Sequence, residues 1–143
     1  MKRITGIVLF VMMIAAVSCS RSKYSDIREF ISEVVATQDE FLLLLDNSAK
    51  AEDAVAAVEV FGNKLIKLSE KSMEIKKRYP DIDKWVDNPP ADLKADLEKL
   101  DNTGSKFEQV FFKENVKNIV KDKKVQTAFI ELNKKMESVK FFQ

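Results

Sequence analysis

The sequence contains no histidine and one cysteine, Cys19, and these shortages exclude several classes of site. Zinc sites with nitrogen and sulfur ligands, haem held by histidine, and catalysis by Cys/His or Ser/His/Asp groups need residues that are missing here. Of the three glycines, only Gly62 and Gly104 follow the first eighteen residues, so no glycine-rich phosphate loop can form. We therefore expect no enzyme activity, no cofactor and no metal site.

The chain also lacks a strong charge of either sign. It has 24 basic and 23 acidic residues, a net charge of +1, and loss of Lys2 and Arg3 with a leader would bring it near −1. Domains that bind nucleic acid are usually strongly basic. We expect no nucleic-acid partner.

The first nineteen residues have the pattern of a secretory leader. Lys2 and Arg3 precede an apolar run from Ile4 to Val17 that contains no acidic residue and no proline. A run of about 14 residues is too short to cross a hydrocarbon core, which takes roughly 20 helical residues, and is typical of a signal peptide. Ala16-Val17-Ser18-Cys19 resembles the lipobox of bacterial lipoproteins. The resemblance implies cleavage before Cys19 and a diacylglycerol on its sulfur.

Two alternatives to lipidation stay open. The small residues Ala16 and Ser18 also suit the ordinary signal peptidase, and an uncleaved leader would serve as an anchor. Ala16 stands where most lipoboxes have leucine. Because no second cysteine exists to pair with Cys19, lipidation is favoured.

The lipoprotein hypothesis divides the chain into three parts: a signal peptide over 1–18, a lipidated cysteine and short tether over 19–24, and a domain over 25–143. The partner implied by Cys19 is a membrane. Ser20 follows the cysteine where aspartate would favour retention in the inner membrane. By the sorting rule of enteric bacteria, the outer membrane is favoured.

Apolar residues recur at helical spacing through most of 25–143, and no stretch shows sustained β alternation. The pattern predicts long helices over 25–45, 51–79, 91–120 and 122–139. Ser25 and Asp122 are the expected N-caps. Residues 80–90 hold all three prolines and predict the only long connection, with a short helix inside it. The predicted fold is all-α: a roughly antiparallel bundle of about four amphipathic helices, with one proline-rich connection.

Three details of the pattern make further predictions. Residues 101–104 have the composition of a turn, but the apolar stripe keeps its phase through Gly104, which predicts one helix with a weak point there. Ala54, Ala57 and Gly62 predict that a neighbouring helix approaches closely. Consecutive leucines at 43 and 44 widen the stripe of their helix and predict burial on more than one side.

Charge is unevenly distributed along the chain. Residues 26–59 hold nine acids and two bases, a net −7, whereas 64–78 and 102–143 are each net +4. This predicts that the acidic first helix lies against basic neighbours, although exposed ion pairs contribute only about 0–1 kcal/mol each. The remaining lysines are expected to be solvated.

Aromatic residues supply the candidate contact sites. Three phenylalanines lie on the helical stripes and are expected in the core: Phe107, Phe111 and Phe129. Phe112 lies off the stripe, and Phe141 and Phe142 follow the last clear turn, so these three are candidates for partner or ligand contact. Trp85 is expected to cap one end of the core, or else to mark a recognition loop beside the prolines.

Two segments flanking the proline-rich connection, 76–80 (KKRYP) and 89–94 (PPADLK), resemble parts of small, helical, uncharacterised bacterial lipoproteins. That resemblance implies the fold and the compartment only. We expect a membrane-anchored, non-catalytic lipoprotein of the cell envelope that binds an envelope protein or supports envelope organisation. The alternative is a small-molecule or lipid-binding helical module with a phenylalanine-lined cavity.

Overall fold

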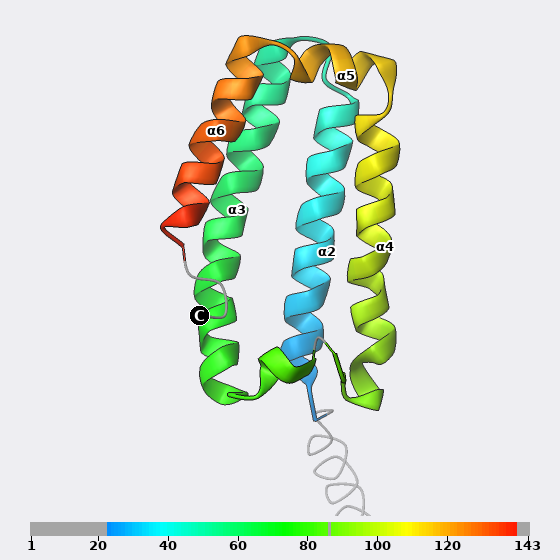
Figure 1. The fold of residues 1–143 in the computed structure, drawn as a ribbon, viewed down its shortest axis with the longest axis vertical. Coiled ribbons are helices and arrows are strands. Elements are labelled where there is room, and N and C mark those ends of the chain that lie inside the picture. Colours follow the sequence, from blue (N-terminus) through cyan, green and yellow to red (C-terminus); the bar gives the residue numbers. More distant parts are fainter. Residues whose placement is uncertain (1–22, 86, 140–143) are drawn as a thin grey trace, which may run out of the picture.

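The computed structural model describes residues 23–85 and 87–139, and Figure 1 shows how their helices are arranged. The four long helices are α2 (Ser25–Asp46), α3 (Ala51–Arg78), α4 (Lys94–Phe111) and α6 (Lys123–Glu137). Three short elements join them: η1 (Ile82–Trp85) and η2 (Ala91–Leu93) between α3 and α4, and α5 (Glu114–Val120) between α4 and α6. The described residues contain no strand, so the predicted all-α bundle is confirmed.

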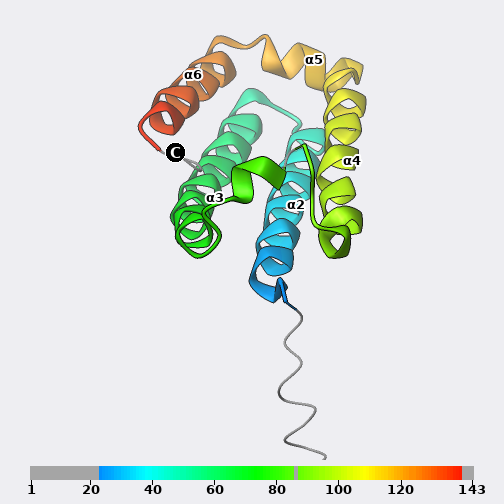
Figure 2. The ribbon, with the colours of Figure 1, turned by 60° about the horizontal axis from the view of Figure 1, so that its bottom comes forward.

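The long helices lie side by side in the order α6, α3, α2, α4 and form a curved layer (Figures 1 and 2). They alternate in direction along the chain, as predicted. Ion pairs between α2 and α4 join residues 67 or 68 positions apart, from Arg28–Asp96 to Asp46–Lys113, so these two neighbours run parallel. We call the end where α2 begins and α3 ends the proximal end. The distal end holds the α2–α3 turn, α5 and the start of α6.

The buried residues form two clusters. The proximal cluster consists of Tyr24, Ile27, Phe30, Ile31, Leu68, Ile75 and Leu93. The distal cluster consists of Phe41, Leu42, Leu45, Ala54, Ala57, Val58, Val116, Val125 and Leu132. Phe107, Phe111 and Phe129 pack against the distal cluster and are partly buried, which confirms their predicted place in the core.

Helix α4 passes without interruption through Gly104, as predicted, but this glycine is exposed. Thr103 takes the buried position, with 1% exposure, and its hydroxyl donates a hydrogen bond of 2.9 Å to the carbonyl of Lys99. The chain leaves the helix at Lys113, whose backbone is extended. The prediction of one helix continuing to residue 120 was therefore wrong. The turn allows α5 to cross the distal end and to bury Val116 completely.

The two predicted N-caps have different outcomes. Asp122 caps α6, and its carboxylate accepts a hydrogen bond of 2.8 Å from the N–H of Lys124. Ser25 is instead the first residue of α2 and Tyr24 takes the cap position, so the prediction of Ser25 as an N-cap was wrong. The carboxylate of Asp26 accepts the N–H of Ile27 at 3.0 Å and satisfies one of the free amide groups that begin a helix.

The small residues of α3 pack as predicted. Ala54 and Ala57 are buried in the distal cluster, and a Cβ atom at Gly62 would lie 2.8 Å from the Cδ1 atom of Leu132 on α6. The prediction for the adjacent leucines was wrong, because Leu43 is 62% exposed and Leu44 is 39% exposed. Both lie in the distal half of α2.

Candidate functional site

An aromatic cluster closes the proximal end of the bundle. The ring of Trp85 lies 5.4 Å from that of Tyr24 and 5.6 Å from that of Tyr79, measured between centroids. The two tyrosine rings are 5.9 Å apart. Trp85 is half-buried and packs on the proximal cluster, so it caps one end of the core as predicted.

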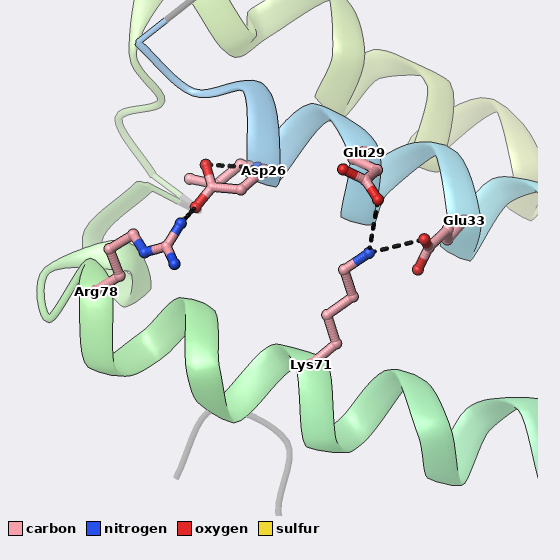
Figure 3. A network of polar contacts seen from close by, with 6 residues as sticks. Asp26, Glu29, Glu33, Lys71 and Arg78 are labelled. Carbon is pink, nitrogen blue, oxygen red and sulfur yellow. Dashed lines mark hydrogen bonds and ion pairs between the residues drawn. The ribbon is translucent and has the colours of Figure 1, made fainter. Parts of the chain in front are cut away.

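Beside this cluster, a carboxylate joins the start of α2 to the end of α3 (Figure 3). Asp26 accepts hydrogen bonds from the guanidinium of Arg78 at 2.6 Å and from the phenol of Tyr79 at 3.1 Å. Partial burial alone would raise the pKa of Asp26, but these hydrogen bonds and that from Ile27 outweigh burial and hold the pKa below its usual value. Burial and the hydrogen bond to Asp26 together raise the pKa of Tyr79.

A second contact between the same helices lies one turn further along α2 (Figure 3). The ammonium group of Lys71 donates to Glu33 at 2.7 Å and to Glu29 at 3.2 Å. The hydrogen bond to Glu33 is the main cause that raises the pKa of Lys71, against the effect of its partial burial. Both carboxylates are turned toward a lysine, so they hold the helices together.

The same pairing extends along the whole of α2. Its acids meet a base of α3 at Glu40–Lys64, a base of α4 at Asp39–Lys106 and the cap residue of α5 at Asp46–Lys113. The predicted contact of an acidic first helix with basic neighbours is thus confirmed.

The distal half of the bundle exposes apolar side chains instead. Phe112, directly after α4, is 68% exposed, and the ammonium group of Lys117 lies 5.3 Å from the centre of its ring. Four other large apolar residues of the distal half are exposed: Leu43, Leu44, Val60 and Ile130. In the proximal half, Met73 is the corresponding residue within the described ranges.

Sequence reasoning missed the exposure of Leu43 and Leu44, although helical geometry could have found it. The buried residues of this turn are Phe41, Leu42 and Leu45, which occupy one side of α2. Successive residues of a helix differ by about 100° in direction, so Leu43 and Leu44 cannot share that side. The helical period by itself therefore predicts that these two leucines lie on the surface.

A hollow of about 770 Å³ lies between α3 and α6. Its floor includes Val55, Ala128 and Leu132, and charged residues such as Glu59 and Lys135 surround it. No phenylalanine lines it, because the phenylalanines of the distal half pack against one another. The rings of Phe41, Phe61, Phe107, Phe111 and Phe129 form a connected set with centroids 4.4–6.5 Å apart.

The structure does not bring the predicted contact residues together. Trp85 lies at the proximal end and Phe112 at the distal end. Cys19, Phe141 and Phe142 lie outside the described residues. Of the predicted set, Phe112 is the residue whose exposure suits a contact with another molecule.

No protein-family model matches the sequence, and none of the curated proteins or solved structures matches it. Within residues 23–85 and 87–139, no helix combines the length and apolar character needed to cross a membrane. The same residues contain no group of three or more acidic, histidine or cysteine side chains placed to hold a metal ion.

Proposed function

We propose that this chain is a bacterial lipoprotein, anchored by lipid on Cys19, whose helical domain binds another protein of the cell envelope and catalyses no reaction. The anchor is supported by the Ala16-Val17-Ser18-Cys19 sequence, which follows a basic and then an apolar segment. Two or three acyl chains, with about 0.8 kcal/mol for each buried methylene, hold a protein stably on a bilayer.

The binding role rests on one observation: the exposed apolar side chains gather in the distal half. Leu43, Phe112 and Ile130 are each more than half exposed there, at 62%, 68% and 53%. Single exposed apolar residues are common on soluble proteins and need no explanation. Their concentration in one half of a small bundle is what favours a protein partner at that half.

The short tether determines which end of the bundle lies near the membrane. Residues 20–24 separate Cys19 from the first residue of α2 and span at most about 17 Å when extended. The proximal end is therefore held close to the bilayer. The 28 residues of α3 extend for about 42 Å from that end, so the distal end is the part of the domain best able to meet a partner away from the membrane.

The absence of catalysis is supported by the chemistry of the carboxylates. Acid–base catalysis by carboxyl groups needs two of them with different pKa values converging on one cleft. Here Asp26, Glu29 and Glu33 each meet a cationic side chain of α3. Such contacts occupy oxygens of all three carboxylates.

The proposal is tested by photo-crosslinking in intact cells. A photoreactive amino acid is placed at Leu43 and at Phe112, and, as controls, at the exposed proximal residues Glu74 and Lys77. We expect adducts of defined mass from the two distal positions only. Absence of adducts at Leu43 and Phe112, or equal labelling at all four positions, would contradict a distal binding surface.

The anchor is tested separately with the Cys19→Ala variant. We expect radiolabelled palmitate to enter the wild-type protein and not the variant, because no other cysteine is present. We also expect the wild type in the membrane fraction and the variant in the soluble fraction. Equal palmitate incorporation by both proteins would show that Cys19 is not the lipidated residue.

A further inference from the structure

The distal end carries a surface formed by Phe112, Lys117, Lys121 and Lys123, which we call the Phe112 surface. Phe112 follows α4, and Lys117 on α5 places its ammonium group over the Phe112 ring, at 5.3 Å from the centroid. Lys121 is four residues beyond Lys117, the spacing that puts two side chains on one face of a helix. Lys123 is the first residue of α6.

Three lysines of this surface form no ion pair with the rest of the described bundle. Residues 112–124 hold five lysines and two acids, a net +3. Lys113 and Lys124 form ion pairs with Asp46 and Glu52. Within the described part of the chain, Lys117, Lys121 and Lys123 form no ion pair.

The two acids of this segment, Asp122 and Glu114, form no ion pair with these three lysines in the described residues. The carboxylate of Asp122 accepts the backbone N–H of Lys124 at the start of α6. Glu114 lies in the first turn of α5, where its charge suits the positive end of the helix dipole. The ammonium group of Lys117 thus lies over one exposed aromatic ring, and Lys121 and Lys123 follow along the chain toward the start of α6.

We infer that the Phe112 surface binds an acidic segment of a partner protein, with an apolar side chain of that segment resting on the Phe112 ring. The inference rests on the proposed function, because it identifies the partner of the same distal end. Charge complementarity supplies the attraction and the orientation, and the exposed ring supplies apolar area that ion pairs alone lack. The headgroups of the anchoring bilayer are not the expected occupant, since the tether holds the opposite end against them.

The test is binding of a fluorescein-labelled peptide to the full chain in detergent. The probe repeats Glu-Glu-Asp-Leu three times, and its control repeats Gln-Gln-Asn-Leu three times. We expect the acidic probe to bind and the amide control to bind at least tenfold more weakly. Binding should weaken as salt is added, because ions screen exposed charges.

Variants locate the site. Lys121→Glu with Lys123→Glu is expected to weaken probe binding at least tenfold, and Phe112→Ala about fivefold. The matched control is Lys67→Glu with Lys94→Glu, which changes the net charge equally at two exposed lysines without ion pairs in the described residues. That control should leave affinity within about twofold. Far-ultraviolet circular dichroism and thermal melts verify that all variants remain folded.

Three outcomes would overturn the inference: equal binding of the two peptides, equal loss in the control variant, or tighter binding of phosphatidylglycerol vesicles than of the peptide by the same lysines. The experiments separate failure of this inference from failure of the proposed function. Crosslinks from Leu43 without peptide binding at Phe112 would support the proposed function and contradict binding at the Phe112 surface. Peptide binding without crosslinks at either distal position would retain the surface and reject the function.

Discussion

Gly62→Ala tests the close contact by which α6 is seated on α3. In the native chain, a Cβ atom at this position would lie 2.8 Å from Cδ1 and 3.9 Å from Cγ of Leu132. The first distance is shorter than the contacts that real Cβ atoms make, so the Leu132 side chain must move. Cδ1 is the end of a flexible side chain, and Leu132 borders the hollow between α3 and α6, so it can move at a modest cost.

Two effects of opposite sign set the magnitude. Alanine is favoured over glycine inside a helix by about 0.8–1.0 kcal/mol, whereas forcing extra volume into a packed core costs about 1–3 kcal/mol. Because the obstructing atom can move, the cost falls at the low end of that range, and we expect Gly62→Ala to leave the free energy of unfolding nearly unchanged. In a Leu132→Ala background the obstructing atoms are gone, and the same substitution should raise it by about 1 kcal/mol. The coupling energy between the two sites is then about 1 kcal/mol.

Urea denaturation followed by far-ultraviolet circular dichroism measures all four proteins of this cycle. Gly104→Ala is the matched control, because a Cβ atom there meets nothing within 4 Å. It should stabilise the chain by about 1 kcal/mol in either background. If Gly62→Ala stabilises the native background as much as Gly104→Ala does, the close approach of α6 to α3 is refuted.

Two further predictions concern the ends of the bundle. The pKa of Asp26 is lower in the folded chain than in the unfolded chain, so its contribution is complete above about pH 5 and is lost as the pH falls through the folded value. Asp26→Asn should lower the free energy of unfolding by about 1 kcal/mol at pH 7 and flatten the loss between about pH 5 and pH 3. The control Asp101→Asn, at an exposed position, should change the free energy of unfolding at pH 7 by under about 0.5 kcal/mol. Val116 is fully buried, so Val116→Ala should lower the free energy of unfolding by about 2 kcal/mol. The control Val60→Ala, at a position that is 40% exposed, should lower it by under about 0.5 kcal/mol. Similar losses for the two valines would show that α5 is not docked as described.

Much of the secondary structure was predictable because the apolar residues of an amphipathic helix recur with the helical period. The buried side chains of α2 and α3 recur at the spacing expected for one helical face. The same reasoning carried α4 correctly through the turn-like residues before Gly104. In that segment, the packing of one continuous face outweighed the low helix propensity of a single glycine.

The break after α4 was not predictable from local sequence. Phe112 and Lys113 are neither proline nor glycine, and both occur in helices. The turn is stabilised by tertiary contacts: Val116 enters the distal cluster, and Lys113 reaches Asp46 at 2.6 Å. Asn115 donates to the carbonyl of Asp46 at 3.3 Å and satisfies an acceptor at the end of α2. These contacts join residues 67 and 69 positions apart, which no local pattern reveals.

The candidate site was predictable only in part. Phe112 was identified because it lies off the apolar stripe, and its exposure in the structure agrees with that position. The lysines beside it could not be separated from ordinary solvated lysines. A lysine that remains unpaired differs from one that is paired only through the fold, as Lys121 and Lys124 show within one short segment.

The order of the helices explains which lysines the acids of α2 can reach. Acidic α2 lies between α3 and α4, so its carboxylates neutralise bases on both of these neighbours. Helix α5 begins only where α2 ends, and α6 lies beyond α3. Lys113 before α5 and Lys124 in α6 are paired, whereas Lys117, Lys121 and Lys123 form no ion pair in the described residues. The turn that begins α5 also leaves the Phe112 ring exposed, with the ammonium group of Lys117 over it. A partner that supplies carboxylates and an apolar side chain would pair with these lysines as the acids of α2 pair with bases of α3 and α4.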